Sequence, residues 1–207
     1  KIIYRRCILK RAKLICLSCL LLFLLSACGK TMEQGTWQEK TFTNPWAQIC
    51  FSAEGCTSLN AEQMREWTNG AASASYNDPA QKMKLKEVDL YYDCILLLQQ
   101  EKCSVQLIYE NLSDLPEVTE VEYAQMLIEK FGQLTAAQYA YDGESEASIG
   151  GQAYICHTWE VNESVIQRIY LRRQEKAMIC IATSCPEEAV GVIDDFLQGI
   201  TDPTQKE

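Results

Sequence analysis

The chain has 207 residues, of which 47% are hydrophobic and 23% charged, and its formal net charge is −9. Six of the 19 basic residues and none of the 28 acidic ones lie in the first 27 positions, so the remainder carries 13 basic against 28 acidic residues, a net charge of −15. Such an acidic surface repels phosphate groups, which argues against nucleic acid as a partner. The remaining length suits one domain with a sizeable core.

The first 27 residues have the three-part layout of a secretory signal. A basic stretch leads into the apolar run from Leu14 to Leu25, and small residues follow. This run of about a dozen residues is shorter than the roughly 20 that a membrane-crossing helix needs. The sequence therefore predicts a signal peptide over 1–27. Arg5-Arg6 also resembles a twin-arginine export motif, but the Leu-rich run favours the general secretory route.

The segment Leu25-Ser26-Ala27-Cys28 resembles the lipobox of bacterial lipoproteins. In that motif, small residues precede a cysteine whose thiol receives a diacylglyceryl group. Two acyl chains give stable membrane anchoring where a single chain is marginal. We therefore expect lipidation at Cys28, a short tether over 28–36, and a location on the extracytoplasmic face of the cell membrane.

Seven cysteines follow the lipobox, and an odd number cannot all pair within one molecule. Export favours disulfides, and the possible pairs by sequence are Cys50 with Cys56 and Cys180 with Cys185. Cys94 and Cys180 also stand in apolar runs, where a thiol behaves as a small core residue. None of the seven cysteines after the lipobox has the Cys-x₂-Cys spacing of zinc sites. We predict no metal and no other cofactor.

The first half of the expected domain contains strands and one short helix. Strands around 41–43 and 49–51 flank Asn44-Pro45-Trp46 and predict an opening β-hairpin. A short helix over 61–70 follows, with Asn60 as its N-cap. The Ala- and Ser-rich stretch 71–79 is expected to be a loop.

The second half begins with a long hairpin over 88–98 and 104–112. Thr119 and Glu122 have the spacing of a capping box and predict a helix that ends near Gly132. A closing helix is expected to start at Pro186. Between these helices the sequence predicts four strands, over 139–141, 153–161, 165–172 and 177–184.

This order makes neighbouring strands pair and predicts an α+β domain over 37–200, an antiparallel sheet flanked by helices, with a tail over 201–207. The opening around Asn44-Pro45-Trp46, the turn at 149–154 and the terminal helix at 186–188 are similar to those of a known family. On these features the chain resembles the PsbP-like fold, an α/β/α sandwich, in the version found among small lipoproteins of Firmicutes. The resemblance implies a non-catalytic accessory or binding domain.

Catalytic candidates in this sequence are few. His157 is the single histidine, and it alternates with apolar residues along a predicted strand, which is typical of a core or sheet-surface residue. Neither a Gly-x-Ser-x-Gly elbow nor a Gly-x-x-x-x-Gly-Lys loop occurs. The basic cluster Arg172-Arg173 with Lys176 is expected to close a turn or to dock an acidic partner. The acidic pairs are typical of solvated faces: Glu120 with Glu122, Glu144 with Glu146, and Asp194 with Asp195.

We therefore expect a membrane-anchored bacterial lipoprotein that is not an enzyme. Its predicted role is that of a binding or envelope-assembly accessory domain, with a protein or envelope component as partner. Two alternatives stay open: a hydrolase or metal-dependent enzyme centred on His157, and a small-ligand carrier.

Overall fold

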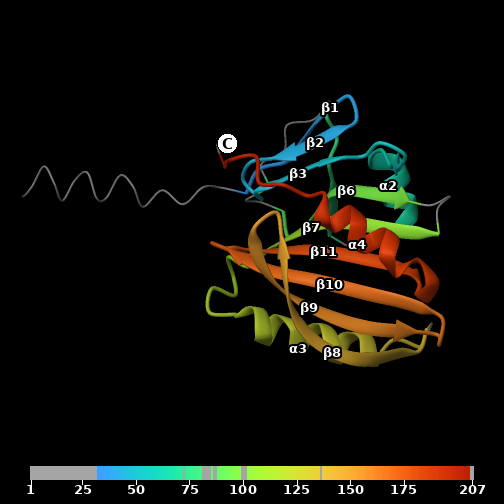
Figure 1. The fold of residues 1–207 in the computed structure, drawn as a ribbon. Coiled ribbons are helices and arrows are strands. Elements are labelled where there is room, and N and C mark those ends of the chain that lie inside the picture. The colour runs from blue at the N-terminus through green and yellow to red at the C-terminus, as the bar shows by residue number, and fades with distance from the viewer. Residues whose placement is uncertain are drawn as a thin grey trace, which may run out of the picture. The chain divides into compact units, whose positions relative to one another are not determined.

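Two β-sheets and three helices make up the part of the chain that the computed structural model describes, residues 32–71, 73–80, 85, 88–98, 102–135 and 137–205 (Figure 1). The strands are β1 (Thr36–Gln38), β2 (Thr41–Asn44), β3 (Ile49–Ser52), β4 (Thr57–Ser58), β5 (Ala74–Tyr76), β6 (Leu90–Leu98), β7 (Cys103–Asn111), β8 (Tyr139–Ile149), β9 (Gln152–Val161), β10 (Val165–Gln174) and β11 (Ala177–Pro186). The helices are α2 (Ala61–Trp67), α3 (Glu120–Gly132) and α4 (Val190–Gln198), and the 3-10 turn η2 (Glu187–Ala189) leads into α4.

Strand pairing in both sheets is antiparallel, except that β5 runs parallel to β6. The small sheet has the order β1-β2-β3, and the large one β4-β6-β7-β11-β10-β9-β8 with β5 beside β6. The expected antiparallel α+β class is thereby confirmed. Two pairings depart from the expectation that neighbours in sequence pair. β4 pairs with β6, and β7 pairs with β11, from Ser104 opposite Ser184 to Asn111 opposite Ala177. The β7–β11 joint connects the early hairpin to the later four-stranded meander.

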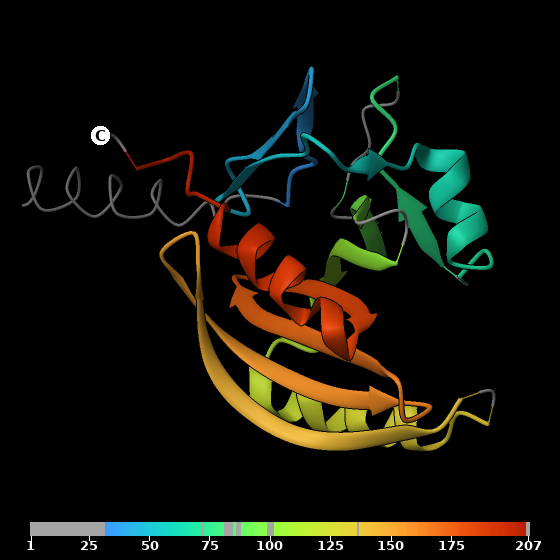
Figure 2. The same cartoon turned by 45° about the vertical axis from the view of Figure 1, so that its right-hand side comes forward.

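The large sheet is covered on both faces. On β11, Ile179 and Ile181 pack toward one core, whereas Cys180 and Ala182 pack toward another, as alternation along a strand requires. The small sheet and α4 cover the first face, and α3 covers the second (Figure 2). Helix α2 packs on β6 through a third cluster. The sheet is thus flanked by helices, as the sequence predicted.

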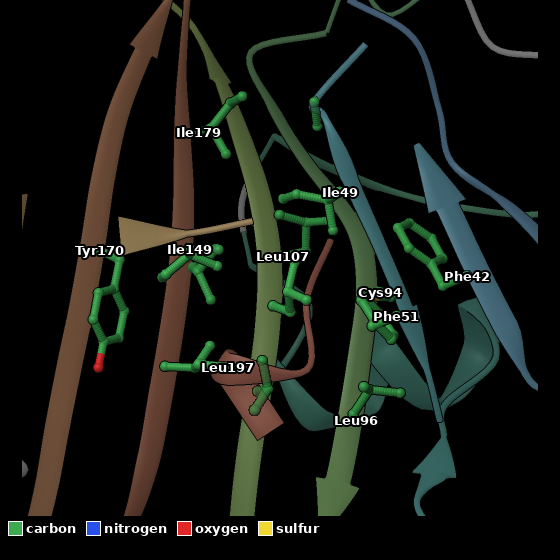
Figure 3. Close-up of a cluster of buried hydrophobic side chains, with 14 of the residues drawn as sticks. Phe42, Ile49, Phe51, Cys94, Leu96, Leu107, Ile149, Tyr170, Ile179 and Leu197 are labelled. Carbon is green, nitrogen blue, oxygen red and sulfur yellow. The ribbon is translucent and has the colours of Figure 1, made fainter. Parts of the chain in front are cut away.

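Aromatic side chains attach the small sheet to the large one. Phe42 of β2 and Phe51 of β3 stack with ring centroids 5.0 Å apart. Both rings lie beside Cys94 and Leu96 of β6 in the core, with Leu107 of β7 next to them (Figure 3). The expected opening hairpin is therefore a buried part of the core.

The local signals for helix ends and tight turns are also confirmed. Asn60 and Gln63 form a reciprocal capping box at α2, and Thr119 and Glu122 form one at α3. The turn between β8 and β9 holds Gly150 with φ of 60° and Gly151 with φ of 76°, the conformation that glycine adopts without steric cost.

Several segments differ from the sequence-based expectation. Helix α2 ends at Trp67 rather than near Gly70, and the closing helix begins with the 3-10 turn η2, so that α4 starts at Val190 rather than at Pro186. Strand β8 continues to Ile149 instead of ending at Tyr141, because an edge strand that pairs only with β9 keeps its backbone bonds while its side chains stay polar and exposed. Strand β5 lies inside the expected loop 71–79. The expected tail is attached where it begins, since Thr201 exchanges two backbone hydrogen bonds of 2.8 Å with Cys50.

Candidate functional site

A β-bulge in β6 places one carboxylate inside the protein. Tyr92 lies opposite Ile108 of β7, but the next pair in register is Cys94 with Leu107. Asp93 therefore has no residue opposite it, and a bulge of this kind redirects the side chain of the extra residue. Asp93 is only 1% exposed to solvent.

Four side-chain and backbone donors surround this carboxylate. The Gly35 amide lies 2.9 and 3.0 Å from its two oxygens, Asn77 Nδ2 donates at 2.8 Å, Asn44 Nδ2 at 2.9 Å and the Tyr109 hydroxyl at 2.6 Å. We call these five residues the Asp93 cluster. Its donors come from the segment before β1, from β2, from the segment after β5 and from β7, so the cluster joins the two sheets.

Two opposing effects set the protonation of Asp93. Burial raises its pKa to about 6, and the hydrogen bonds from Tyr109, Asn44, Gly35 and Asn77 oppose this rise because they stabilise the ionised form. The carboxylate is therefore ionised at neutral pH. No cation is needed to compensate it, since charge-assisted hydrogen bonds occupy both oxygens.

Gly35 is required by its contacts rather than by its backbone conformation. A Cβ at this position would lie 2.1 Å from Cζ of Phe42 and 2.8 Å from Oδ2 of Asp93. Both distances are far below van der Waals contact. Any side chain at Gly35 would thus separate the first segment of the domain from the cluster.

Asn44 connects the Asp93 cluster to the β2–β3 turn. Its Oδ1 accepts the Ala47 amide at 2.9 Å, while its Nδ2 donates to Asp93. On the other side of the turn, the Arg172 guanidinium donates to the Ala47 carbonyl at 2.5 Å and to Gln48 Oε1 at 2.9 Å. The same guanidinium lies 5.3 Å from the centre of the Tyr154 ring. The turn is therefore held from both sides.

Internal partners bind the two guanidinium groups of the basic cluster. Arg172 is engaged with the β2–β3 turn, and Arg173 donates to the carbonyls of Pro116 and Val118 before α3. Both guanidinium groups therefore have internal partners that hold loops in place. Arg173 Nε also donates to the Glu175 carbonyl at 3.2 Å, within the β10–β11 turn that the cluster was expected to close, and docking of an acidic partner stays a prediction.

A pocket of about 290 Å³ adjoins the Asp93 cluster. The β1–β2 turn, β4, the start of α2 and the segment after β5 form its walls, with Asp93 and Asn77 among its lining residues. Asn77 Nδ2 donates to two acceptors, the Gly35 carbonyl and Asp93, and this fixes the orientation of the amide. Its buried Oδ1 has no hydrogen-bond partner among the described residues. The other residues lining the pocket are Trp37, Glu39, Lys40, Ala53, Cys56, Ser58, Leu59, Asn60, Met64 and Pro79.

His157 lies away from this pocket, on β9. It is 2% exposed, its Nδ1 lies 3.0 Å from the Tyr141 hydroxyl, and its buried Nε2 has no partner in the described ranges. Burial lowers its pKa, which keeps the ring neutral at physiological pH. Cys156, its neighbour in sequence, packs in the core on the opposite face of the sheet. The structure thus places His157 within the sheet, and its recorded polar contact is with a tyrosine.

The cysteine predictions have different outcomes. Cys28 lies outside the described residues. Cys180 and Cys185 stand five residues apart on β11 and pack on opposite faces, which separates them by roughly 16 Å. A disulfide needs Cα atoms within about 7 Å, so the structure does not bring this pair together. Cys50 and Cys56 are recorded as thiols, and their pairing stays a prediction.

The acidic pairs have structural roles at several positions. Glu122 completes the capping box of α3, Glu120 accepts the Arg173 amide at 2.9 Å, and Asp194 forms a 2.8 Å ion pair with Arg168. Glu144 and Glu146 are exposed on the edge strand β8. Within the described ranges, no group of three His, Cys, Asp or Glu residues could hold a metal ion. In the same part of the chain, no helix is both long and apolar enough to cross a membrane.

Comparison with known proteins finds similarity at the level of solved structures. No family model and no curated protein matches the chain. Among solved structures it is similar to the solution structure of cyanobacterial PsbP (CyanoP) from Synechocystis sp. PCC 6803, with 11% sequence identity and a TM-score of 0.48, over 85% of this chain and 95% of that one. The antiparallel α+β class itself rests on the strand pairing.

The Asp93 cluster was not predicted from the sequence. A signal for it existed, because Asp93 interrupts an otherwise apolar strand between Tyr92 and Cys94. An acidic residue in such a run indicates a buried carboxylate with dedicated donors. The donors themselves come from distant segments and could not be found by spacing.

Replacing Tyr109 by Phe should destabilise the protein in a pH-dependent way. The variant lacks a donor to Asp93, so we expect a loss of about 1–3 kcal/mol in the free energy of unfolding at pH 7. The folded pKa of about 6 lies above the unfolded value of 3.8, so the stability linked to Asp93 is complete below pH 3.8 and lost as pH rises through 6. Loss of the donor raises the folded pKa further. In urea titrations the deficit of the variant should therefore stay nearly constant from pH 4 to about pH 6, where both proteins lose stability at the same rate, and grow as the pH rises above 6.

Tyr91 provides the matched control for this measurement. It lies directly opposite Tyr109 on β6 and is equally buried, but its hydroxyl has no hydrogen-bond partner among the described residues. The Tyr91→Phe variant should keep the stability of the parent protein at each pH. Equal losses in the two variants would contradict the role assigned to Asp93.

Proposed function

We propose that the chain is a lipid-anchored, non-enzymatic domain on the extracytoplasmic face of a Gram-positive cell membrane, where it binds a protein or another envelope component. A diacylglyceryl group on Cys28 is its anchor in this proposal. The lipobox-like segment, the acidic composition and the internal use of the buried polar groups support it.

The non-enzymatic part of the proposal rests on one observation: the oxygens of the Asp93 carboxylate are already hydrogen-bonded to other residues of the domain. This carboxylate is the buried acid nearest the pocket, and a catalytic base there would need a vacant lone pair directed at a substrate. Its oxygens instead accept hydrogen bonds from Gly35, Asn44, Asn77 and Tyr109. Proton transfer at Asp93 would disrupt the contacts that join the two sheets.

The Asp93 cluster also limits the length of the membrane tether, because it fixes the chain at Gly35. The Gly35 amide is bound by Asp93, so six residues, 29–34, separate the clamped position from Cys28. A chain of that length reaches at most about 20–25 Å. An anchored domain of this kind would act on partners at the membrane surface or close to it.

The pocket favours a second candidate, the small-ligand carrier. Its walls combine apolar side chains such as Trp37 and Met64 with the charged Glu39 and Lys40, and a mixed lining of this kind suits a small amphipathic ligand. Both candidate functions, ligand carriage and partner binding, would use this pocket. A ligand-induced rise in the melting temperature would favour the carrier.

Replacing Cys28 by Ala should abolish lipidation. Cells that produce the parent chain and are labelled with palmitate should yield a labelled protein whose mass shows a diacylglyceryl group and loss of residues 1–27. The Cys28→Ala variant should be unlabelled and keep its first 27 residues.

The Cys56→Ala variant is the control, because Cys56 is a half-buried thiol within the domain. It should be labelled as strongly as the parent chain. Palmitate incorporation into the Cys28→Ala variant would show that the anchor lies elsewhere.

Filling the pocket should remove the binding function while the fold persists. Ser58 is exposed on β4 and lines the pocket, so a Ser58→Trp side chain would occupy its volume. Thr57 is equally exposed on β4 but does not line the pocket, and Thr57→Trp is the matched control. In a strain that lacks the chain and shows an envelope defect, Thr57→Trp should restore the parent phenotype and Ser58→Trp should not. Equal complementation by the two variants would rule out the pocket as the binding site.

A further inference from the structure

Two buried cysteines from distant parts of the sequence meet where β7 pairs with β11. The register of this pairing places Ser104 opposite Ser184. Cys103 precedes Ser104 on β7, and Cys185 follows Ser184 on β11. One further step of the same antiparallel register therefore sets Cys103 opposite Cys185.

Both side chains lie on the same face of the large sheet. Cys103 is 1% exposed and Cys185 3% exposed, and both belong to the core cluster beneath the small sheet and α4. Burial raises the pKa of Cys185 to about 11, and the charge of a neighbouring Cys103 thiolate contributes to this rise. The two cysteines are thus close together on one face of the sheet, as the register of β7 and β11 predicts.

The geometry of antiparallel strands suits a covalent bond at this position. Directly opposed residues have Cα atoms about 4.5–5.5 Å apart, and disulfides span about 4.4–6.8 Å between Cα atoms. The Cβ atoms of such pairs lie about 4.5–5.5 Å apart, and they need to approach by up to about 1 Å to reach the usual disulfide distance. Cys103 is the first residue of β7, where such a shift displaces little of the sheet.

We propose that Cys103 and Cys185 form a disulfide that covalently locks β7 to β11. Each thiol loses its proton, and the two sulfurs together lose two electrons as the S–S bond forms. A disulfide-bearing thiol oxidoreductase, or oxidised glutathione in vitro, takes up the two electrons and two protons and becomes a pair of thiols. Because both cysteines are buried in the folded domain, the exchange takes place while β11 docks on β7.

The position of this bond gives it its structural effect. The β7–β11 pairing is the joint between the early hairpin and the later meander, and it closes a loop that contains α3 and β8 to β10. A disulfide across a long loop restricts the unfolded chain most strongly. The bond would therefore stabilise the joint that local interactions support least. Its formation in cells rests on the proposed export, because cytosolic reductants keep thiols reduced.

Peptide mapping of the full chain from the producing cells tests the proposal. After alkylation without reduction, trypsin should release peptide 103–130 linked to peptide 177–206, and a reductant should separate them. Cys180 lies in the second peptide as well but packs on the other face of the sheet, so Cys180→Ala is the matched control. The link should persist in Cys180→Ala and be lost in Cys185→Ala. Reduction should lower the melting temperature of the linked proteins by about 5–10 °C more than that of Cys185→Ala.

Refolding in vitro tests the cysteine pair without depending on the proposed export. The full chain is unfolded, reduced and refolded with oxidised glutathione. A link that forms there but is missing from cells would support the cysteine pair and contradict export to an oxidising location. If Cys103 and Cys185 are alkylated both in protein from cells and after oxidative refolding, the proposal is overturned.

Discussion

The ionised carboxylate of Asp93 lies between the two sheets, and a buried charge in that position is stable only while hydrogen bonds surround it. Its donors belong to segments that share no regular secondary structure with one another: Gly35 precedes the small sheet, Asn44 ends β2, and Tyr109 lies on β7. Folding of the small sheet and formation of the hydrogen bonds to Asp93 therefore depend on each other. The β-bulge in β6 is what makes the arrangement possible.

The same constraint explains the Asn-Pro-Trp turn at the opening of the domain. Asn44 hydrogen-bonds both to the turn that it begins and to Asp93. Trp46 packs edge-on against Tyr109 at 5.0 Å, and Arg172 binds the far side of the turn. The Asn-Pro-Trp turn is thus an attachment between two layers. Its role is structural, and through Asn44 it is hydrogen-bonded to Asp93, which lines the pocket.

Local patterns predicted much of the fold and little of the site. The N-cap at Asn60, the capping box at Thr119 and the long hairpin could be predicted from spacing because their determinants lie a few residues apart. The β7–β11 joint and the donors to Asp93 depend on residues tens of positions apart, which no local pattern encodes. The sequence predicted too short a strand for β8, because an exposed edge strand carries polar side chains like those of a loop. His157 looked like a candidate because it is the single histidine, and the structure buries it against Tyr141.

Native-state hydrogen exchange at the Gly35 amide tests the central role of Asp93 most directly. If the Asp93 cluster joins the two sheets into one cooperative unit, this amide should exchange with nearly the same opening free energy as the central amides of β7 and β11. The amides shared by β2 and β3 should do the same. An opening free energy several kcal/mol lower at Gly35 and in the small sheet would show that this layer opens independently, and would contradict the account.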